Sequence, residues 1–201
     1  MELKQLLKQI VQNNDYHTRF LNTLSLQENI GARKISASEQ PETTSFMVLK
    51  HAAEEHRHAF YLKKQIQKIA PDACPTYAPE YLLAPHRSKY YLNKLDLETA
   101  RYLKTRLGLT ASALKYGCYL FVTYAIEVRA DILYPIYQQV LDQSKSKVSV
   151  KNIIIEEQGH LEEMIAQLNL FSSEWEIHAQ SITTIEQRLY DSWIQDLADA
   201  V

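Results

Sequence analysis

The chain has 201 residues, a formal net charge of −2, and 46% hydrophobic and 23% charged residues. This length suits one domain with a sizeable core, and the balance is that of a globular, water-soluble protein. The near-neutral charge gives no electrostatic reason to expect nucleic acid or an acidic membrane as a partner. The chain has only four glycines, which favours long helices over strands joined by tight turns.

The two cysteines, Cys74 and Cys118, form neither a Cys-x-x-Cys motif nor a disulfide framework. A reducing cytoplasm is therefore the expected compartment. The first residues are amphipathic rather than basic and then apolar, so no signal peptide is expected. The most apolar window, residues 117–126, is about half the length that crosses a bilayer. We expect a buried helix there and no membrane association.

Apolar residues at helical spacing predict the first elements in chain order. The first helix is expected over residues 3 to about 34, and the second over 48–69, where Pro71 ends it. Residues 71–95 contain four of the six prolines among tyrosines. This stretch predicts an extended connection, long enough to cross from one end of a helix bundle to the other.

The second half of the chain repeats the helical pattern. Asp96 can cap a short helix that runs to about Gly108, and Thr110 opens a long helix to about Gln143. A polar turn at 142–147 precedes a fourth stripe over 150–168. Residues 173–200 predict an extra amphipathic helix that covers the bundle or a partner subunit.

These elements predict one all-α domain over residues 1–201. Four long helices would form two antiparallel hairpins in a bundle over about residues 3–170, joined by the 71–95 crossover. The C-terminal helix, at about 173–200, is additional to this bundle.

Carboxylates and histidines interrupt the apolar stripes on their core side. The affected positions, spaced three or four residues from core residues, are Glu28, Glu55, His58, Glu127, Glu157 and His160. An ionised carboxylate in a core costs several kcal/mol or more. Four of them in one bundle require compensating cations, and two divalent metals would neutralise them. The Glu-x-x-His spacing places both side chains on the same side of a helix.

The two halves of the chain carry the same order of these residues. Each Glu-x-x-His pair follows a lone core glutamate on the preceding helix, and the local texts are Glu-Glu-His-Arg-His at 54–58 and Glu-Glu-Gln-Gly-His at 156–160. A metal site with near two-fold symmetry would produce such a weak internal repeat in the sequence. The alternative is that the helices are rotated differently about their axes, so that these glutamates lie on the surface. The spacing does not decide whether Glu54 or Glu55 faces the core, nor whether Glu156 or Glu157 does.

This set resembles the ligands of the ferritin-like di-iron carboxylate proteins, in which two helices give one Glu each and two others give Glu-x-x-His. The resemblance covers about residues 3–170. It implies two iron ions, with Mn/Fe and Mn/Mn pairs as alternatives. It also implies that Glu55, Glu157 or both bridge the metals, that Glu28 and Glu127 are terminal ligands, and that each histidine binds one metal. The missing Cys-x-x-Cys pairs argue against a full-length rubrerythrin.

Several nearby residues are weaker candidates. Tyr124 and Thr123 lie three and four residues before Glu127, where they could contact a ligand or line a substrate pocket, or simply pack in the core. His51 shares the face of Glu55 and is interpreted as a core-edge histidine, with an extra ligand or a hydrogen-bond partner of one as alternatives. His17 is interpreted as packing.

Three functions are compatible with such a site. The first is an oxidase or oxygenase that uses O2 or peroxide, an unknown electron donor and a small organic substrate. It is favoured because the halves differ near the site, as in Leu24 against Thr123, and a one-sided pocket needs such differences. The 71–95 segment could close over this pocket. The second is ferroxidase or peroxidase activity, as in a ferritin or rubrerythrin-like protein, and the third a non-catalytic metal-binding bundle. A homodimer is left open.

Overall fold

The computed structural model describes residues 2–39, 42 and 44–201, and every regular element in them is helical. The elements in chain order are α1 (Leu3–Gln12), α2 (Asn14–Ser38), α3 (Phe46–Gln67), the 3-10 helix η1 (Pro79–Tyr81), α4 (Pro85–Leu107), α5 (Ala111–Gln143), α6 (Lys151–Phe171) and α7 (Trp175–Asp199). The expectation of an all-α protein is confirmed for this part of the chain. None of these helices combines the length and apolarity that a membrane span requires.

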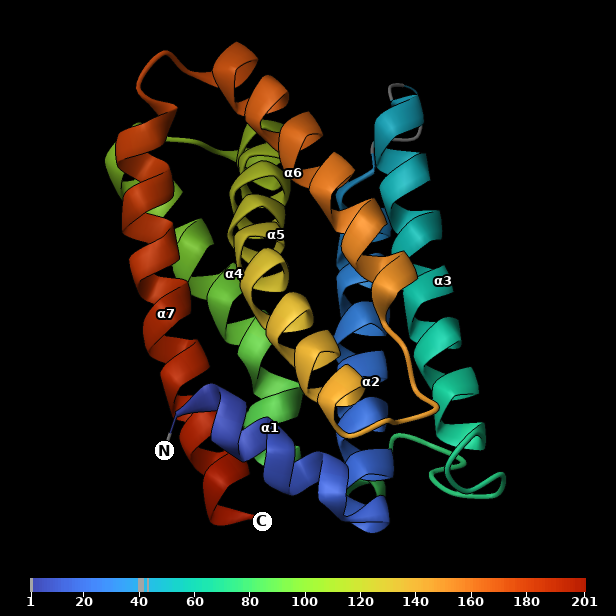
Figure 1. Cartoon of the computed structure of the whole chain (residues 1–201). Coiled ribbons are helices and arrows are strands. Elements are labelled where there is room, and N and C mark those ends of the chain that lie inside the picture. The colour runs from blue at the N-terminus through green and yellow to red at the C-terminus, as the bar shows by residue number, and fades with distance from the viewer. Residues whose placement is uncertain (1, 40–41, 43) are drawn as a thin grey trace.

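Four long helices form two hairpins that pack side by side (Figure 1). α2 packs along α3, and α5 packs along α6. The helices α4 and α7 pack against each other and against α5, and α4 also contacts α2. α1 lies across one end of the bundle, below α5 in the view of Figure 1. One side of the α2–α5 pair therefore faces α3 and α6, and the other faces α4 and α7.

Large aromatic side chains fill the space between the bundle and α7. Trp193 of α7 is 1% exposed and stacks on Phe20 of α2 and Tyr91 of α4. Tyr137 of α5 meets Phe20 edge to face. Burying a side chain of this size stabilises the fold by about 1.5–3 kcal/mol. The C-terminal helix therefore completes the core of this chain, as expected of a helix that covers the bundle.

The helix expected over residues 3–34 is two helices. Asn13 has extended backbone angles, and its side-chain oxygen accepts hydrogen bonds from the backbone N–H groups of Asp15 and Tyr16. This is an N-cap, which satisfies donors that a helix start leaves unpaired. The apolar pattern of α1 and α2 is similar enough to hide this break in the sequence.

The prediction of an extended connection over 71–95 was wrong for its second half, because α4 begins at Pro85. Proline suits the first turn of a helix, where its missing N–H would be unpaired anyway. From there Ser88, Tyr91 and Leu92 continue a buried stripe at helical spacing. The short helix expected from Asp96 is thus the second half of α4. The expected helices over 110–143, 150–168 and 173–200 are confirmed as α5, α6 and α7.

Candidate metal centre

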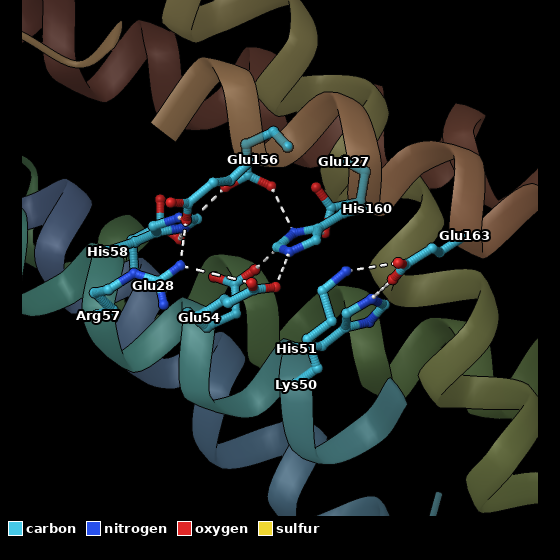
Figure 2. A network of polar contacts seen from close by, with 12 residues as sticks. Glu28, Lys50, His51, Glu54, Arg57, His58, Glu127, Glu156, His160 and Glu163 are labelled. Atoms are coloured by element: carbon cyan, nitrogen blue, oxygen red, sulfur yellow. Dashed lines mark hydrogen bonds and ion pairs between the residues drawn. The ribbon is translucent and has the colours of Figure 1, made fainter. Parts of the chain in front are cut away.

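The six residues singled out in the sequence meet in the middle of the four long helices (Figure 2). α2 contributes Glu28, α3 and α6 contribute the two Glu-x-x-His pairs, and α5 contributes Glu127. All are buried except Glu28, whose side chain is 13% exposed. Their ligand atoms form two overlapping groups, Glu28–Glu55–His58–Glu157 and Glu55–Glu127–Glu157–His160. Glu55 and Glu157 are common to both groups.

The Nδ1 atoms of both histidines face the carboxylates. His58 Nδ1 lies 3.0 Å from Glu157 Oε1 and 4.0 Å from Glu28 Oε2. His160 Nδ1 lies 3.1 Å from Glu157 Oε2, 3.6 Å from Glu127 Oε1 and 3.9 Å from Glu55 Oε1. Each group thus brings one imidazole nitrogen and three carboxylates to a common centre.

The Nε2 atom of each histidine contacts a glutamate of the opposite helix. These two glutamates, Glu54 and Glu156, each directly precede an inward-facing glutamate in the chain. His58 Nε2 lies 2.7 Å from Glu156 Oε2, and His160 Nε2 lies 2.7 Å from Glu54 Oε2. Because an ionised carboxylate only accepts hydrogen bonds, each Nε2 carries the hydrogen. A neutral imidazole then presents the lone pair of Nδ1 to a metal. The phase of both helices is thereby resolved, with Glu55 and Glu157 pointing inward.

Crowding of acidic groups shifts their pKa values in opposite directions. Burial and the neighbouring Glu28 and Glu157 raise the pKa of Glu55 well above its usual range, and burial and Glu157 do the same for Glu127. Burial alone would raise the pKa of Glu157, but the adjacent side chains of Glu127, His160 and His58 hold it well below that range. Without a metal, the cluster retains protons that divalent cations would displace.

Two buried atoms in the cluster support a cation rather than protons alone. His58 Nδ1 and Glu127 Oε2 are buried and have no hydrogen-bond partner among the described residues. A buried polar atom without a partner costs about 1–3 kcal/mol. His58 Nδ1 lies 3.0 Å from Glu157 Oε1, and Glu127 belongs to the second ligand group. The buried Glu and His side chains could therefore hold a metal ion, and nitrogen and carboxylate donors suit iron, manganese or zinc.

Arg57 lies on the outer side of the centre, over the two outer glutamates (Figure 2). Its Nη2 lies 2.6 Å from Glu156 Oε2 and 3.6 Å from Glu54 Oε1. The equivalent position of α6 is Gly159, where an added Cβ would meet no atom within 4 Å. One guanidinium therefore holds both of the carboxylates that orient the histidines. Sequence reasoning missed this contact, although the unequal texts at 54–58 and 156–160 already marked it.

His51 is a buried neighbour of the site. Its Nε2 lies 2.7 Å from Glu163 Oε2, and its Nδ1 lies 2.9 Å from the hydroxyl of Tyr119. Its ring centroid is 4.7 Å from that of His160. Both ring nitrogens are thus occupied by hydrogen bonds, which favours a supporting role over an extra ligand.

The two tentative residues of the third long helix have different places. Thr123 is buried and lines a cavity together with Glu127. Tyr124 points elsewhere: its ring meets Trp175 edge to face at 5.5 Å, and it does not line that cavity. Tyr134, two helical turns after Glu127, donates a hydrogen bond to Glu28 instead. Its spacing from Glu127 was the signal that could have identified it.

A cavity of about 360 Å³ extends from the carboxylates toward α4 and α7. Glu28, Glu55 and Glu127 form part of its wall, whereas neither His58 nor His160 lines it. Most of the remaining wall is apolar, from α2, α4 and α5. From the stretch over 71–95 only Tyr91 and Leu92, both in α4, line it. The connection before α4 therefore does not close over the cavity.

Arg129, which lines the cavity, belongs to a buried ion pair that sequence reasoning missed. Arg129 of α5 donates from Nε and Nη2 to the carboxylate of Glu186 in α7, at 2.9 and 2.7 Å. Tyr91 of α4 donates a hydrogen bond to the same carboxylate. This network joins three helices. Glu186 lies next to Ile185 on an otherwise apolar stripe, and that interruption was the available signal.

No protein-family model, no curated protein and no solved structure matches the chain.

Proposed function

We propose that the chain is a dinuclear non-haem iron oxidoreductase, of the ferritin-like di-iron carboxylate kind, that uses O2 or peroxide to oxidise a small organic substrate. One observation carries this proposal: the apolar cavity ends on three of the four carboxylates and lies on the side away from the histidines. A pocket of 300–1,000 Å³ with few polar groups is typical of small-molecule sites. A protein that only stores metal has no use for such a pocket beside its carboxylates.

The residues have distinct roles in this proposal. Glu55 and Glu157 belong to both ligand groups and would be shared by two metals, while Glu28 and Glu127 would each hold one. A pair of ferrous ions supplies two electrons to O2 or peroxide when bound. Manganese in one or both positions is compatible with the same donors. The electron donor that restores the ferrous pair is a separate partner, of unknown identity.

The protein around the centre positions these groups and keeps water away. Glu54 and Glu156 hold the histidines with Nδ1 inward. Tyr134 holds a proton at Glu28 and lines the cavity. Thr123 and Val122 form the wall beside Glu127. A substrate in the cavity would lie in a largely apolar space, where polar interactions are stronger than in water.

The first experiment is to count metals per chain after anaerobic loading with Fe(II) and desalting. About two irons per chain are expected, and fewer in Glu127→Ala. Exposure to air should then oxidise the iron. Tyr124→Phe is the matched control on the same helix and should keep the wild-type iron content. A wild-type chain that binds neither iron nor manganese would contradict the proposal.

Ferroxidase or peroxidase activity is a second candidate, favoured by the polar side of the centre. The side chains of Glu54 and Glu156, 18% and 32% exposed, could guide cations inward between α3 and α6. Ala130→Leu, which reduces the cavity, separates the two functions: oxidation of an organic substrate should fall while oxidation of Fe(II) persists. Ala113→Leu, at an exposed position of the same helix, is the control. Iron that stays inert to O2 would favour a non-catalytic bundle. A cytoplasmic location and a homodimer remain predictions.

A further inference from the structure

The helix α3 carries a second apolar stripe, on the side opposite to its core. Its members follow one another at spacings of three, four and seven residues and therefore lie along one side of the helix: Phe46, Leu49, Ala53 and Phe60. All four are exposed, and the two phenylalanines are 83% and 64% exposed. The buried side chains of α3 form a separate stripe. An exposed apolar stripe on a helix that already has a buried one is typical of a surface that contacts another molecule.

The neighbouring helix α6 extends this apolar surface. It lies beside α3 in Figure 1 and runs in the opposite direction, so that Tyr61 near the end of α3 contacts Ser149 just before α6. Ile155 and Leu170 of α6 are 69% and 81% exposed and lie on the side opposite to the buried residues of that helix. We call the exposed apolar side chains of the two helices the outer face: Phe46, Leu49, Ala53, Phe60, Ile155 and Leu170.

The polar side chains between α3 and α6 are already paired within the chain. Lys50 Nζ lies 2.6 Å from Glu163 Oε1. Arg57 contacts both Glu54 and Glu156. Covering an unpaired charge is costly, whereas a charge that keeps its partner can be covered. Another molecule can therefore lie against this part of the surface without leaving these charges uncompensated.

The outer face is large enough for a stable interface. A phenylalanine side chain presents about 150–250 Å². At the exposures given above, the six side chains together present on the order of 500 Å² of apolar surface. A standard interface buries about 800 Å² of each partner, slightly more than half of it apolar. The exposed apolar area thus matches what one partner of such an interface contributes.

The spacing on α3 favours a second copy of the chain as the partner. Phe46 lies seven residues before Ala53, and Phe60 lies seven residues after it. When two copies of α3 cross in opposite directions near Ala53, the Phe46 end of one copy meets the Phe60 end of the other. The small side chain of Ala53 lets the two helices approach closely at the crossing. A two-fold interface requires such a self-complementary surface, and an unrelated partner does not.

We propose that two copies of the chain form a homodimer through the outer face, with their α3 helices antiparallel and crossing near Ala53. The contact lies on the α3 and α6 side of the bundle, whereas the cavity extends toward α4 and α7. Both cavities therefore stay accessible in the dimer. This inference depends neither on bound metal nor on the proposed oxidoreductase function.

Sedimentation velocity of the full chain over a range of concentrations up to about 100 µM tests the proposal, and a dimer is expected at the upper end. Leu49→Glu and Phe60→Glu should each raise the dimer dissociation constant at least about tenfold, because a carboxylate would be placed against apolar side chains. Both positions are exposed, so the folded chain should keep its helical circular dichroism. Leu97→Glu in α4 and Ile177→Glu in α7, at exposed apolar positions outside the outer face, are the matched controls and should leave the constant unchanged.

Cross-linking tests the position of the two-fold axis. Ala53 lies near its own counterpart in the proposed dimer, so Ala53→Cys should be joined to a second chain by a short bismaleimide. Ala113→Cys, at an exposed position of α5, is the control and should stay uncoupled. Both native cysteines are buried, which limits their reaction with the reagent.

A wild-type chain that stays monomeric at about 100 µM would overturn the proposal. A dimer that Leu49→Glu and Phe60→Glu leave intact would also overturn it, as would equal cross-linking of the two cysteine variants. A dimer that only Ile177→Glu dissociates would place the contact on α7 instead. Metal loading of the same samples keeps the two proposals separate. A monomer that binds iron removes this inference alone, and a dimer that binds neither iron nor manganese removes the oxidoreductase alone.

Discussion

Arg57 contacts both outer glutamates, so its removal should affect both histidines. In Arg57→Gln, Glu54 and Glu156 lose the cation between them, and the histidines should lose part of their alignment. Loss of a group that orients a metal ligand typically costs about 10–100-fold in metal affinity. Because Arg57 acts through the glutamates, we expect a loss of about three- to tenfold. A competitive titration with Co(II), followed by its visible absorption, measures it.

The mechanism of this effect can be checked in combined variants. In a Glu54→Gln/Glu156→Gln background, Arg57→Gln should have little further effect on metal affinity, because residues in one network are not additive. Arg57→Lys should restore part of the loss. Arg101→Gln, at an exposed position of α4, is the matched control. An additive loss in the triple variant would show that Arg57 acts by another route.

His17 is a buried histidine whose hydrogen bond is to a neutral group. Its Nε2 lies 2.7 Å from the hydroxyl of Tyr137, and burial lowers its pKa from 6.5 to about 4. The unfolded chain therefore binds a proton between these pH values while the folded chain does not. Stability from this group is complete above pH 6.5 and is lost as the pH falls toward 4, by about 3 kcal/mol.

Urea unfolding at pH 7 and pH 4 measures this contribution. In His17→Gln, which retains a hydrogen-bonding side chain, the fall in unfolding free energy between the two values should be smaller by about 3 kcal/mol. His86→Gln, at an exposed histidine, should keep the wild-type dependence. The same dependence in His17→Gln would show that other groups cause the acid sensitivity.

At the scale of the elements, α3 and α6 meet mainly through polar side chains. Lys50 Nζ lies 2.6 Å from Glu163 Oε1, and Tyr61 donates to the backbone oxygen of Ser149 at 2.9 Å. Between these contacts lie the bonds of the two histidines to Glu54 and Glu156. By contrast, α2 and α5 together bury more apolar side chains than α3 and α6 do. Polar contacts near solvent contribute little net stability, so metal binding should matter most at α3 and α6.

Hydrogen exchange tests this expectation. Loading with Mn(II) or Fe(II) should slow amide exchange in the middle of α3 and α6 by about tenfold or more, because the ions link the two hairpins. Exchange in α4 and in the C-terminal half of α7 should change much less. Uniform protection of all the helices would mean that the metals stabilise the bundle as a whole.

For the whole molecule, the metals should compensate three buried carboxylates and that of Glu28, which is 13% exposed. A ligand at about 1,000 times its dissociation constant stabilises the folded state by about 4 kcal/mol per site. For a chain of this length, 1 kcal/mol corresponds to about 2–4 °C. We therefore expect the melting temperature to rise by about 10 °C or more on loading. Calorimetry with and without chelator measures this, and Glu127→Ala should lose at least half of the rise.

Much of this molecule follows from the spacing of residues along the sequence. The period of 3.6 residues determined that the chain is helical, where most helices lie, and that six polar side chains share the core faces. Those six side chains do meet in the structure. The start of α4 at Pro85 was not predicted, because proline is compatible both with an extended segment and with a first helical turn. The break at Asn13 was hidden for a similar local reason.

Only the tertiary structure decided which helices are neighbours and how each side chain turns. Periodicity places Glu54 and Glu55 on adjacent faces but cannot say which one points inward, and the contact of His160 with Glu54 resolves this. It places Tyr124 and Tyr134 on one helix, yet only the packing of α7 directs Tyr124 to Trp175, and only the approach of α2 brings Tyr134 to Glu28. The sequence by itself determined the class of fold and the candidate ligands, because these depend on spacing within single helices. The cavity was decided by the packing of α2, α4, α5 and α7, because it lies between helices that are distant in the chain.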